Sequence, residues 1–185
     1  MNKLTINVGP MFSGKTTALQ QQGTKHSRAN QKVIFLKPYF DNRYSDNYIV
    51  SHDGVKVSAV NIDDTLLISE ALCADVILID EIQFLPKSII KDLWELIKLD
   101  KTIYCSGLDT DYRGKGFETT MEVMSIADKV NKFAGVCAIC TGEATMSGKK
   151  CDNGKRVELG SEDSYYPICK SCYIKEGKGE LCWLQ

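Results

Sequence analysis

The first residues whose types and spacing could do chemistry lie close to the amino terminus. Residues 9–16 read GPMFSGKT and fit the pattern G-x-x-x-x-G-K-[ST], which joins a strand to a helix in nucleotide-binding proteins. Its glycines let backbone N–H groups face phosphate oxygens, and the following helix adds the positive end of its dipole. Lys15 is predicted to neutralise the β- and γ-phosphate oxygens, and Thr16 to offer its hydroxyl to Mg²⁺. The residues assigned to nucleotide binding are Gly9, Pro10, Met11, Phe12, Ser13, Gly14, Lys15 and Thr16.

Two carboxylates follow a run of four apolar residues, Val76 to Ile79. This layout puts Asp80 at the carboxyl end of a buried strand, where it is predicted to face Mg²⁺, acting through a water molecule. Glu81 is then placed to take the proton of a hydroxyl group that attacks phosphorus. The alternative for both residues is a solvated strand end, and for residues 9–16 it is a glycine turn that fits the pattern by chance.

Six of the eight cysteines lie in the last third of the chain. Cys137 with Cys140, and Cys169 with Cys172, form two C-x-x-C pairs that suit a tetrahedral Zn²⁺ site. Because protein thiolates would fill all four corners, this zinc is predicted to be structural and to help fold a tail with little apolar mass. Redox-active cysteines are the alternative. Cys151 and Cys182 have no such pairing, although either could replace a corner.

The segments that must position these groups alternate between short apolar runs and helical patterns. Strands are predicted at 4–8, 32–36, 76–79 and 102–105, and helices at 15–28 and 86–99. The alternation indicates an α/β fold with a parallel sheet flanked by helices, as in nucleotide-binding P-loop proteins. From about Val136 the sequence changes to Cys, Gly, Lys and Ser. We therefore expect an ATP-binding domain over 1–134 and a zinc-binding domain over 135–185.

Composition limits the partners. The 185 residues are 43% hydrophobic, which is enough for a packed core, and 23 basic residues balance 24 acidic ones. A net charge of −1 supplies no positive field for nucleic acid, so a small-molecule partner is expected. No apolar run approaches membrane-spanning length, and nothing resembles a signal peptide. A cytoplasmic protein without a membrane partner is the expectation.

Four segments together resemble the zinc-containing thymidine kinases of the cellular and bacterial type. They are GPMFSGKT at 9–16, IDEIQF at 79–84, GLDTDYRGKGF at 107–117 and the two cysteine pairs. The resemblance is colinear and implies transfer of the γ-phosphoryl group of ATP to the 5′-hydroxyl of thymidine, and of deoxyuridine. It implies that Glu81 is the catalytic base, that Gln83 belongs to the nucleotide site, and that Arg43 stabilises transition-state charge. His52 resembles part of a family loop and is assigned a structural role.

The same resemblance implies a nucleoside pocket that is closed by a lasso loop of the zinc-binding domain. Its residues are Met11, Phe84, Leu108, Tyr112, Phe117, Ser147, Arg156, Val157, Glu158, Leu159, Gly160 and Tyr165. Met11, Leu108 and Tyr165 would receive the thymine methyl group, while main-chain groups of the loop bond the base edge and reject cytosine. Gly116 stands where the family has proline. Tyr112 replaces a common phenylalanine and adds a hydroxyl that needs a partner.

The resemblance also implies a homotetramer and feedback inhibition by thymidine triphosphate. A rival function from another class is a zinc-ribbon P-loop ATPase that acts on nucleic acid. That rival requires basic patches and a second motor lobe, neither of which is evident in a chain this short and this neutral.

Overall fold

The computed structural model describes residues 3–39, 48–50, 54–150 and 164–176. Its centre is a six-stranded sheet in the order β5-β2-β6-β7-β1-β8, in which every neighbouring pair is parallel. The strands are β1 (Leu4–Val8), β2 (Val33–Pro38), β5 (Val60–Ile62), β6 (Val76–Ile79), β7 (Thr102–Gly107) and β8 (Lys129–Lys132). The predicted α/β class is therefore confirmed.

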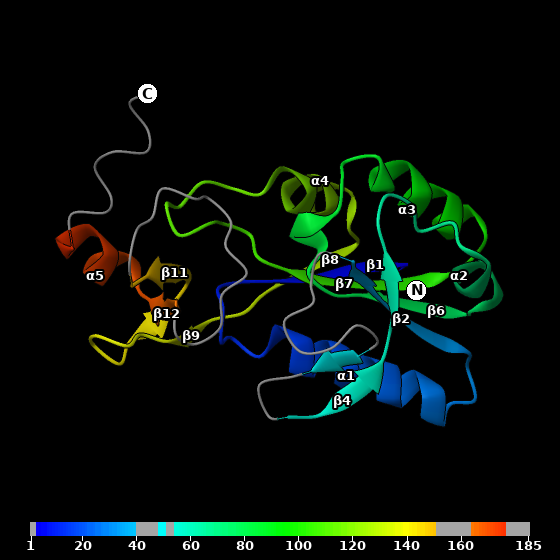
Figure 1. The fold of residues 1–185 in the computed structure, drawn as a ribbon, viewed down its shortest axis with the longest axis horizontal. Coiled ribbons are helices and arrows are strands. Elements are labelled where there is room, and N and C mark those ends of the chain that lie inside the picture. Colours follow the sequence, from blue (N-terminus) through cyan, green and yellow to red (C-terminus); the bar gives the residue numbers. More distant parts are fainter. Residues whose placement is uncertain (1–2, 40–47, 51–53, 151–163, 177–185) are drawn as a thin grey trace.

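Helices cover both faces of this sheet (Figure 1). One face carries α1 (Lys15–Arg28) and the antiparallel hairpin of β3 (Tyr48–Val50) and β4 (Lys56–Ser58). The other carries α2 (Ser69–Cys73), α3 (Ile89–Lys98) and α4 (Glu118–Ile126), together with the 3₁₀ turn η1 (Ile82–Phe84). Two apolar clusters match this layering, because one joins the sheet to α2, α3 and α4, and the other joins it to α1.

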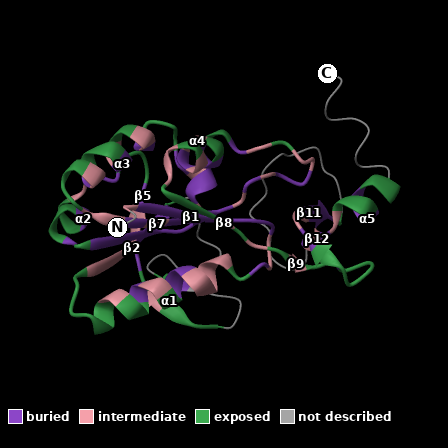
Figure 2. Cartoon of the chain, turned by 180° about the vertical axis from the view of Figure 1, so that it is seen from behind, coloured by how far each residue is buried: buried purple, intermediate pink, exposed green. Residues whose placement is uncertain are grey.

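The central strands are apolar because both of their sides are covered. All four residues of β6 and all five of β1 are buried, and Figure 2 shows the strands inside while the outer sides of α1 and α3 are exposed. Helix α3 buries Ile89, Leu93 and Leu96, which recur at helical spacing. Burial of these apolar side chains stabilises the packing of the helices against the sheet.

Helix α1 and strands β1 and β6 have the bounds predicted from the sequence, whereas the other predicted elements differ at their ends. The helix predicted from Pro86 begins at Ile89, because the bonds from Ile89 N to Pro86 O and from Ile90 N to Lys87 O make the first turn tighter than an α-turn. Strand β2 runs over Val33–Pro38, one residue later at its start and two later at its end. Strand β7 extends two residues further, to Gly107.

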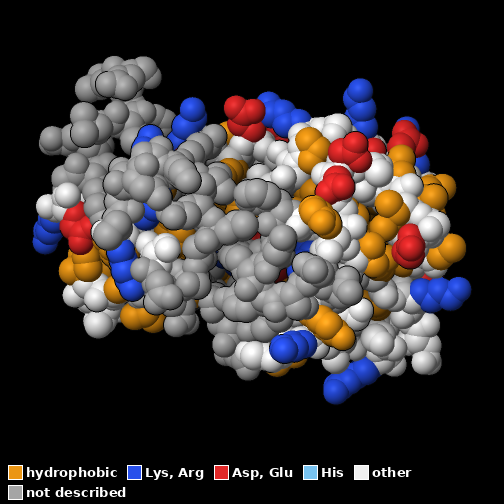
Figure 3. Space-filling model, viewed as in Figure 1, with side chains coloured by type: hydrophobic (Ala, Val, Ile, Leu, Met, Phe, Trp, Pro, Cys, Tyr) orange, Lys and Arg blue, Asp and Glu red, His pale blue; other side chains and the backbone are white. Residues whose placement is uncertain are grey.

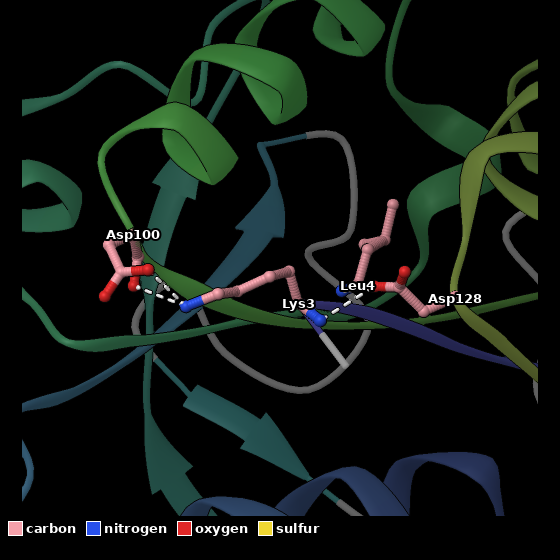
Figure 4. A network of polar contacts seen from close by, with 4 residues as sticks. All are labelled: Lys3, Leu4, Asp100 and Asp128. Carbon is pink, nitrogen blue, oxygen red and sulfur yellow. Dashed lines mark hydrogen bonds and ion pairs between the residues drawn. The ribbon is translucent and has the colours of Figure 1, made fainter. Parts of the chain in front are cut away.

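The amino-terminal ends of the central strands are tied together by carboxylates (Figure 4). Asp128 Oδ2 accepts the main-chain N–H groups of Lys3, at 2.7 Å, and Leu4, at 2.9 Å, just before β8 begins. These bonds lower the pKa of Asp128. Lys3 Nζ also forms an ion pair with Asp100 Oδ1 at 2.5 Å, which joins the start of β1 to the loop before β7. This network lies at the amino-terminal ends of the strands, whereas the phosphate-binding pattern follows the carboxyl end of β1.

The last part of the chain forms small sheets of its own. Strands β9 (Gly135–Val136) and β10 (Glu143–Ala144) pair, β11 (Met146–Lys149) pairs with β12 (Tyr165–Ile168), and α5 (Lys170–Lys175) follows. Their shared core is small and contains Cys137, Ala144, Ile168, Cys172 and Tyr173. We call residues 135–150 and 164–176 the C-terminal unit, which lies at one end of the molecule in Figure 1.

Charges of both signs alternate over the described surface of the face drawn in Figure 3, with hydrophobic side chains between them. Within the described ranges, no helix combines the length and the hydropathy that a membrane span requires.

Candidate active site

The pattern at residues 9–16, which we call the phosphate loop, joins the carboxyl end of β1 to α1 as predicted. Gly9 has φ +147° and lies so close to Phe133 that a Cβ would be 2.3 Å from the Phe133 carbonyl oxygen. Gly14 has φ +82° and is the left-handed N-cap of α1, where a side chain would be strained. Both glycines are therefore required by the path of the loop. The first turn of α1 has no acidic residue, so the positive end of its dipole is not neutralised from within the turn.

Lys15 lies over this loop. Its Nζ donates to Pro10 O at 2.6 Å and to Ser13 Oγ at 3.4 Å, while Ser13 Oγ itself donates to Pro10 O at 2.8 Å. These bonds hold an ammonium group at the start of α1, beside the backbone N–H groups of the turn. Positive charge and N–H donors in one place are the requirement for binding a polyphosphate.

Asp80 follows β6 and is only 5% exposed. Its Oδ2 accepts the hydroxyl of Thr16 at 3.0 Å, which brings together the two residues that the sequence assigns to Mg²⁺. Burial, and after it the charge of Glu81, raises the pKa of Asp80 to about 6. A buried carboxylate beside a hydroxyl is a donor set of hard oxygens, which fits Mg²⁺.

Glu81 is the N-cap that directly precedes the 3₁₀ turn η1, and it has left-handed backbone angles, φ 52° and ψ 43°. Non-glycine residues adopt this conformation at a cost of about 1 kcal/mol or more, and such residues cluster at functional sites. The backbone N–H of Glu81 donates to Asp80 Oδ1 at 3.1 Å, and its carboxylate accepts a hydrogen bond from Gln83 Nε2. Glu81 is thus the partly exposed member of a carboxylate pair whose other member is buried.

Residues 107–117, which we call the GLD loop, begin at the last residue of β7, and two aspartates hold the loop. Asp111 Oδ1 accepts the backbone N–H groups of Arg113, at 3.0 Å, and Lys115, at 2.9 Å. Asp109, which is 6% exposed, forms an ion pair with Lys132 of β8 at 2.9 Å. The loop therefore has a defined shape, and it presents Tyr112 and Phe117 as buried side chains.

The C-terminal unit contacts the phosphate loop and the GLD loop through β11. Ser147 Oγ accepts the backbone N–H of Met11 at 3.0 Å, so two of the predicted nucleoside residues are joined directly. The Lys149 ammonium lies 5.0 Å from the ring centre of Tyr112 and 6.0 Å from that of Tyr165, within cation–π range. The Tyr112 hydroxyl also has the partner it needs, since Arg113 Nε donates to it at 2.8 Å.

Lys149 was not predicted from the sequence, although it is only 3% exposed and contacts two predicted site residues. Lysine in a polar segment is usually a solvated surface residue, so its type alone gave no signal. Its position in β11, directly opposite Tyr165 in the β11–β12 pairing, becomes visible only in the structure.

The four cysteines of the two C-x-x-C pairs lie together within the C-terminal unit. Their Sγ atoms are all within 4.8 Å of one another, and those of Cys140 and Cys169 are 3.6 Å apart. Four thiolates bound to Zn²⁺ at about 2.3 Å would have sulfurs roughly 3.8 Å apart, so the cluster fits this ion. Backbone N–H groups of Cys140 and Cys169 lower the pKa of Cys137 to about 6. The neighbouring cysteines, chiefly Cys140 through a hydrogen bond, raise the pKa of Cys172 to about 12.

Two further predicted nucleoside residues, Leu108 and Phe84, lie at or near η1. Leu108 contributes its backbone N–H, which donates to Gln83 Oε1 at 3.0 Å, and Phe84 ends η1 as a half-buried side chain. Several predictions fall outside the described residues and stay predictions: Arg43, His52, Cys151, Arg156, Val157, Glu158, Leu159, Gly160 and Cys182.

The parallel sheet, the phosphate loop after β1 and the carboxylates after β6 define a P-loop nucleotide-binding protein. Comparison with known proteins narrows this class. The Thymidine kinase family model matches residues 2–173. A thymidine kinase of Pseudothermotoga lettingae is 36% identical over 177 residues, which cover 94% of this chain and 95% of that relative. The chain belongs to the thymidine kinase family, and its enzyme class is that of the nucleoside kinases.

Proposed function

We propose that the protein transfers the γ-phosphoryl group of ATP to the 5′-hydroxyl of thymidine, and of deoxyuridine, giving the nucleoside monophosphate and ADP. The observation that carries this proposal is a continuous series of contacts from the phosphate loop to the GLD loop. Thr16 bonds Asp80, Asp80 accepts the N–H of Glu81, and Gln83 connects the Glu81 carboxylate to the backbone of Leu108. A group that can accept a proton thus lies between the segments assigned to the two substrates.

In the proposed reaction Glu81 accepts the proton of the 5′-hydroxyl as that oxygen bonds to phosphorus. Lys15 neutralises charge on the phosphate oxygens, and Arg43 adds a second cation to the transferred group. Thr16 and Asp80 would hold Mg²⁺, which supplies charge neutralisation on the polyphosphate when bound. Positioning and electrostatics carry the reaction, because phosphoryl transfer requires little covalent chemistry from the protein.

We propose that the nucleoside lies between the GLD loop and the C-terminal unit. Met11, Leu108 and Tyr165 would contact the thymine methyl group, and Phe84, Tyr112, Phe117 and Ser147 would complete the pocket. The bond from Met11 N to Ser147 Oγ and the position of Lys149 between Tyr112 and Tyr165 support this arrangement. Main-chain groups of residues 156–160 would bond the base edge and would leave buried groups unpaired with cytosine.

The zinc proposed for Cys137, Cys140, Cys169 and Cys172 is structural, because four protein thiolates leave no position for a substrate. We further propose a cytoplasmic homotetramer, which sedimentation equilibrium would test. Thymidine triphosphate is proposed as a feedback inhibitor, because it combines a thymine base for the nucleoside pocket with a triphosphate for the phosphate loop.

The test is Glu81→Gln, which keeps the size of the side chain and removes its basicity. We expect kcat for thymidine phosphorylation to fall about 10²- to 10⁴-fold, while thymidine still binds. Radiolabelled ATP and a panel of nucleosides give the activity, and calorimetry gives the binding.

The matched control is Glu70→Gln, at an exposed glutamate of α2, which should keep normal turnover. Near-normal turnover of Glu81→Gln would remove Glu81 from the proposed role. Phosphorylation of another nucleoside in preference to thymidine or deoxyuridine would overturn the proposed substrate.

A further inference from the structure

The side chain of Gln83 is buried between two parts of the site. It is only 7% exposed and belongs to η1, which directly follows Glu81. Its Nε2 donates to the Glu81 carboxylate, and its Oε1 accepts the backbone N–H of Leu108 at 3.0 Å. One amide group therefore joins the proposed base to the loop proposed to border the nucleoside.

The orientation of this amide is determined by its neighbours. A backbone N–H can only donate, so Leu108 requires the amide oxygen, and the NH₂ group must then face the opposite direction. An ionised carboxylate can only accept, so Glu81 requires that NH₂ group. Both partners select the same orientation, and a flipped amide would lose both bonds.

The surrounding packing leaves little room for Gln83 to move. A Cβ on Gly107 would lie 2.5 Å from Gln83 Oε1 and 2.7 Å from Ile82 Cγ2, so the absence of a side chain at Gly107 makes space for the amide. Ile82, on the same turn, is fully buried in the main core. The amide is thus held on one side by packing and on the other by two hydrogen bonds.

We infer that Gln83 is a positioning residue that fixes the Glu81 carboxylate relative to the GLD loop. The inference rests on the proposed function, in which Glu81 accepts the proton of the nucleoside hydroxyl. The partly exposed Glu81 carboxylate can rotate about its side-chain torsions, and a bond from a buried amide removes that freedom. Gln83 therefore acts through Glu81, beyond the nucleotide-site assignment that the family resemblance gives it.

The experiment compares Gln83→Met, which keeps the length and burial of the side chain, with the wild-type enzyme. We expect kcat to fall about 10- to 100-fold, because small misplacements of a catalytic group have effects of that size. KM for ATP and for thymidine should change by less than about threefold, since the interaction acts on the transition state. Unchanged kcat would overturn the inference.

A double-mutant cycle separates positioning from an independent effect on the fold. If Gln83 acts through Glu81, Gln83→Met should cause no further loss in the Glu81→Gln background, to within about twofold. A further tenfold loss there would show that Gln83 acts by another route. If instead Glu81→Gln is itself active, the proposed base fails and the inference falls with it. Inactive Glu81→Gln with fully active Gln83→Met removes the inference alone.

Thr119→Val is the matched control for loss of a buried hydrogen bond in the same region. Thr119 Oγ1 donates to Leu85 O at 2.8 Å, and Leu85 directly follows η1. This variant should lower the melting temperature and leave kcat within about twofold of normal. Should Gln83→Met not fold, Gln83→Asn retains a buried amide that is one methylene too short to join both partners. It should show the same loss of kcat, and normal kcat in Gln83→Asn would overturn the inference.

Discussion

Asp80 shows at the scale of one residue how a functional group opposes stability. Its carboxylate is buried, and burial together with the charge of Glu81 raises its pKa from 3.8 to about 6. The folded state therefore holds the proton of Asp80 more tightly than the unfolded state does. The contribution of Asp80 to the free energy of unfolding falls as pH rises from about 4 to about 6, and stays low above that range.

This sign predicts the behaviour of Asp80→Asn, which keeps the shape of the side chain and removes its charge. At pH 7 without divalent cations, the variant should be more stable than wild type by on the order of 1–2 kcal/mol. The gain should vanish near pH 4, and phosphoryl transfer should be lost because Mg²⁺ loses its carboxylate. Urea unfolding at pH 4 and pH 7 measures the difference. A variant less stable than wild type at pH 7 would contradict the destabilising effect that we assign to the buried charge of Asp80.

Single residues were predictable from the sequence where their type and spacing are tied to a known chemistry. The phosphate loop, Asp80 and Glu81 have such spacing, and Thr16 does contact Asp80. The contact between Gln83 and Leu108 was not predictable from the sequence. Leu108 follows β7 and Gln83 follows β6, so the contact depends on these two strands being neighbours in the sheet. Lys149 was missed for the same reason, since its partners belong to separate segments.

At the scale of elements, the predictions hold where burial imposes a strong pattern. Strand β6 consists of four apolar residues covered on both faces, and its bounds were predicted correctly. Strand β8 reads KVNK and lies at the sheet edge with mostly exposed residues, so it has no apolar pattern to find. Helix α4 begins after the GLD loop without a side-chain cap, and it too was missed. Contacts with the rest of the fold determine these two elements, and the local sequence pattern does not.

The C-terminal unit is the part of the molecule for which we propose a structural zinc ion. Cys169→Ser should reduce bound zinc from about one per chain toward zero, because one of four thiolates is lost. Cys169 Sγ also accepts the backbone N–H of Cys172 at 3.4 Å and so caps α5. A serine hydroxyl can keep this cap, so the substitution tests the metal ligand itself. Atomic absorption measures zinc, and limited proteolysis should reveal earlier cleavage after Val136. Cys73→Ser, at an exposed cysteine of α2, is the control that should keep full zinc. Full zinc occupancy in Cys169→Ser would contradict the ligand set.

At the scale of the whole molecule, composition alone did not give the arrangement of the two regions, although the family resemblance placed Met11 and Ser147 in one pocket. The amino-acid composition changes near Val136, but this change does not indicate which part of the α/β domain the following strands contact. The structure has Gly135 packed against the backbone of Phe12, and Ser147 bonded to Met11. Contacts between residues so distant in the chain depend on the packed fold.

The bond between Ser147 and Met11 predicts that metal binding and nucleotide binding are energetically coupled. Ser147 pairs with Pro167, two residues before Cys169, so the strand that steadies the phosphate loop also borders the thiolate cluster. Coupling of binding free energies is reciprocal, so bound ATP should raise the affinity for zinc by the same factor by which zinc raises the affinity for ATP. Competition with a colorimetric chelator at equilibrium, with and without ATP, measures the zinc affinity, and Ser147→Ala should abolish the difference. Identical zinc affinities in wild type would show that the two ends of the molecule are energetically independent.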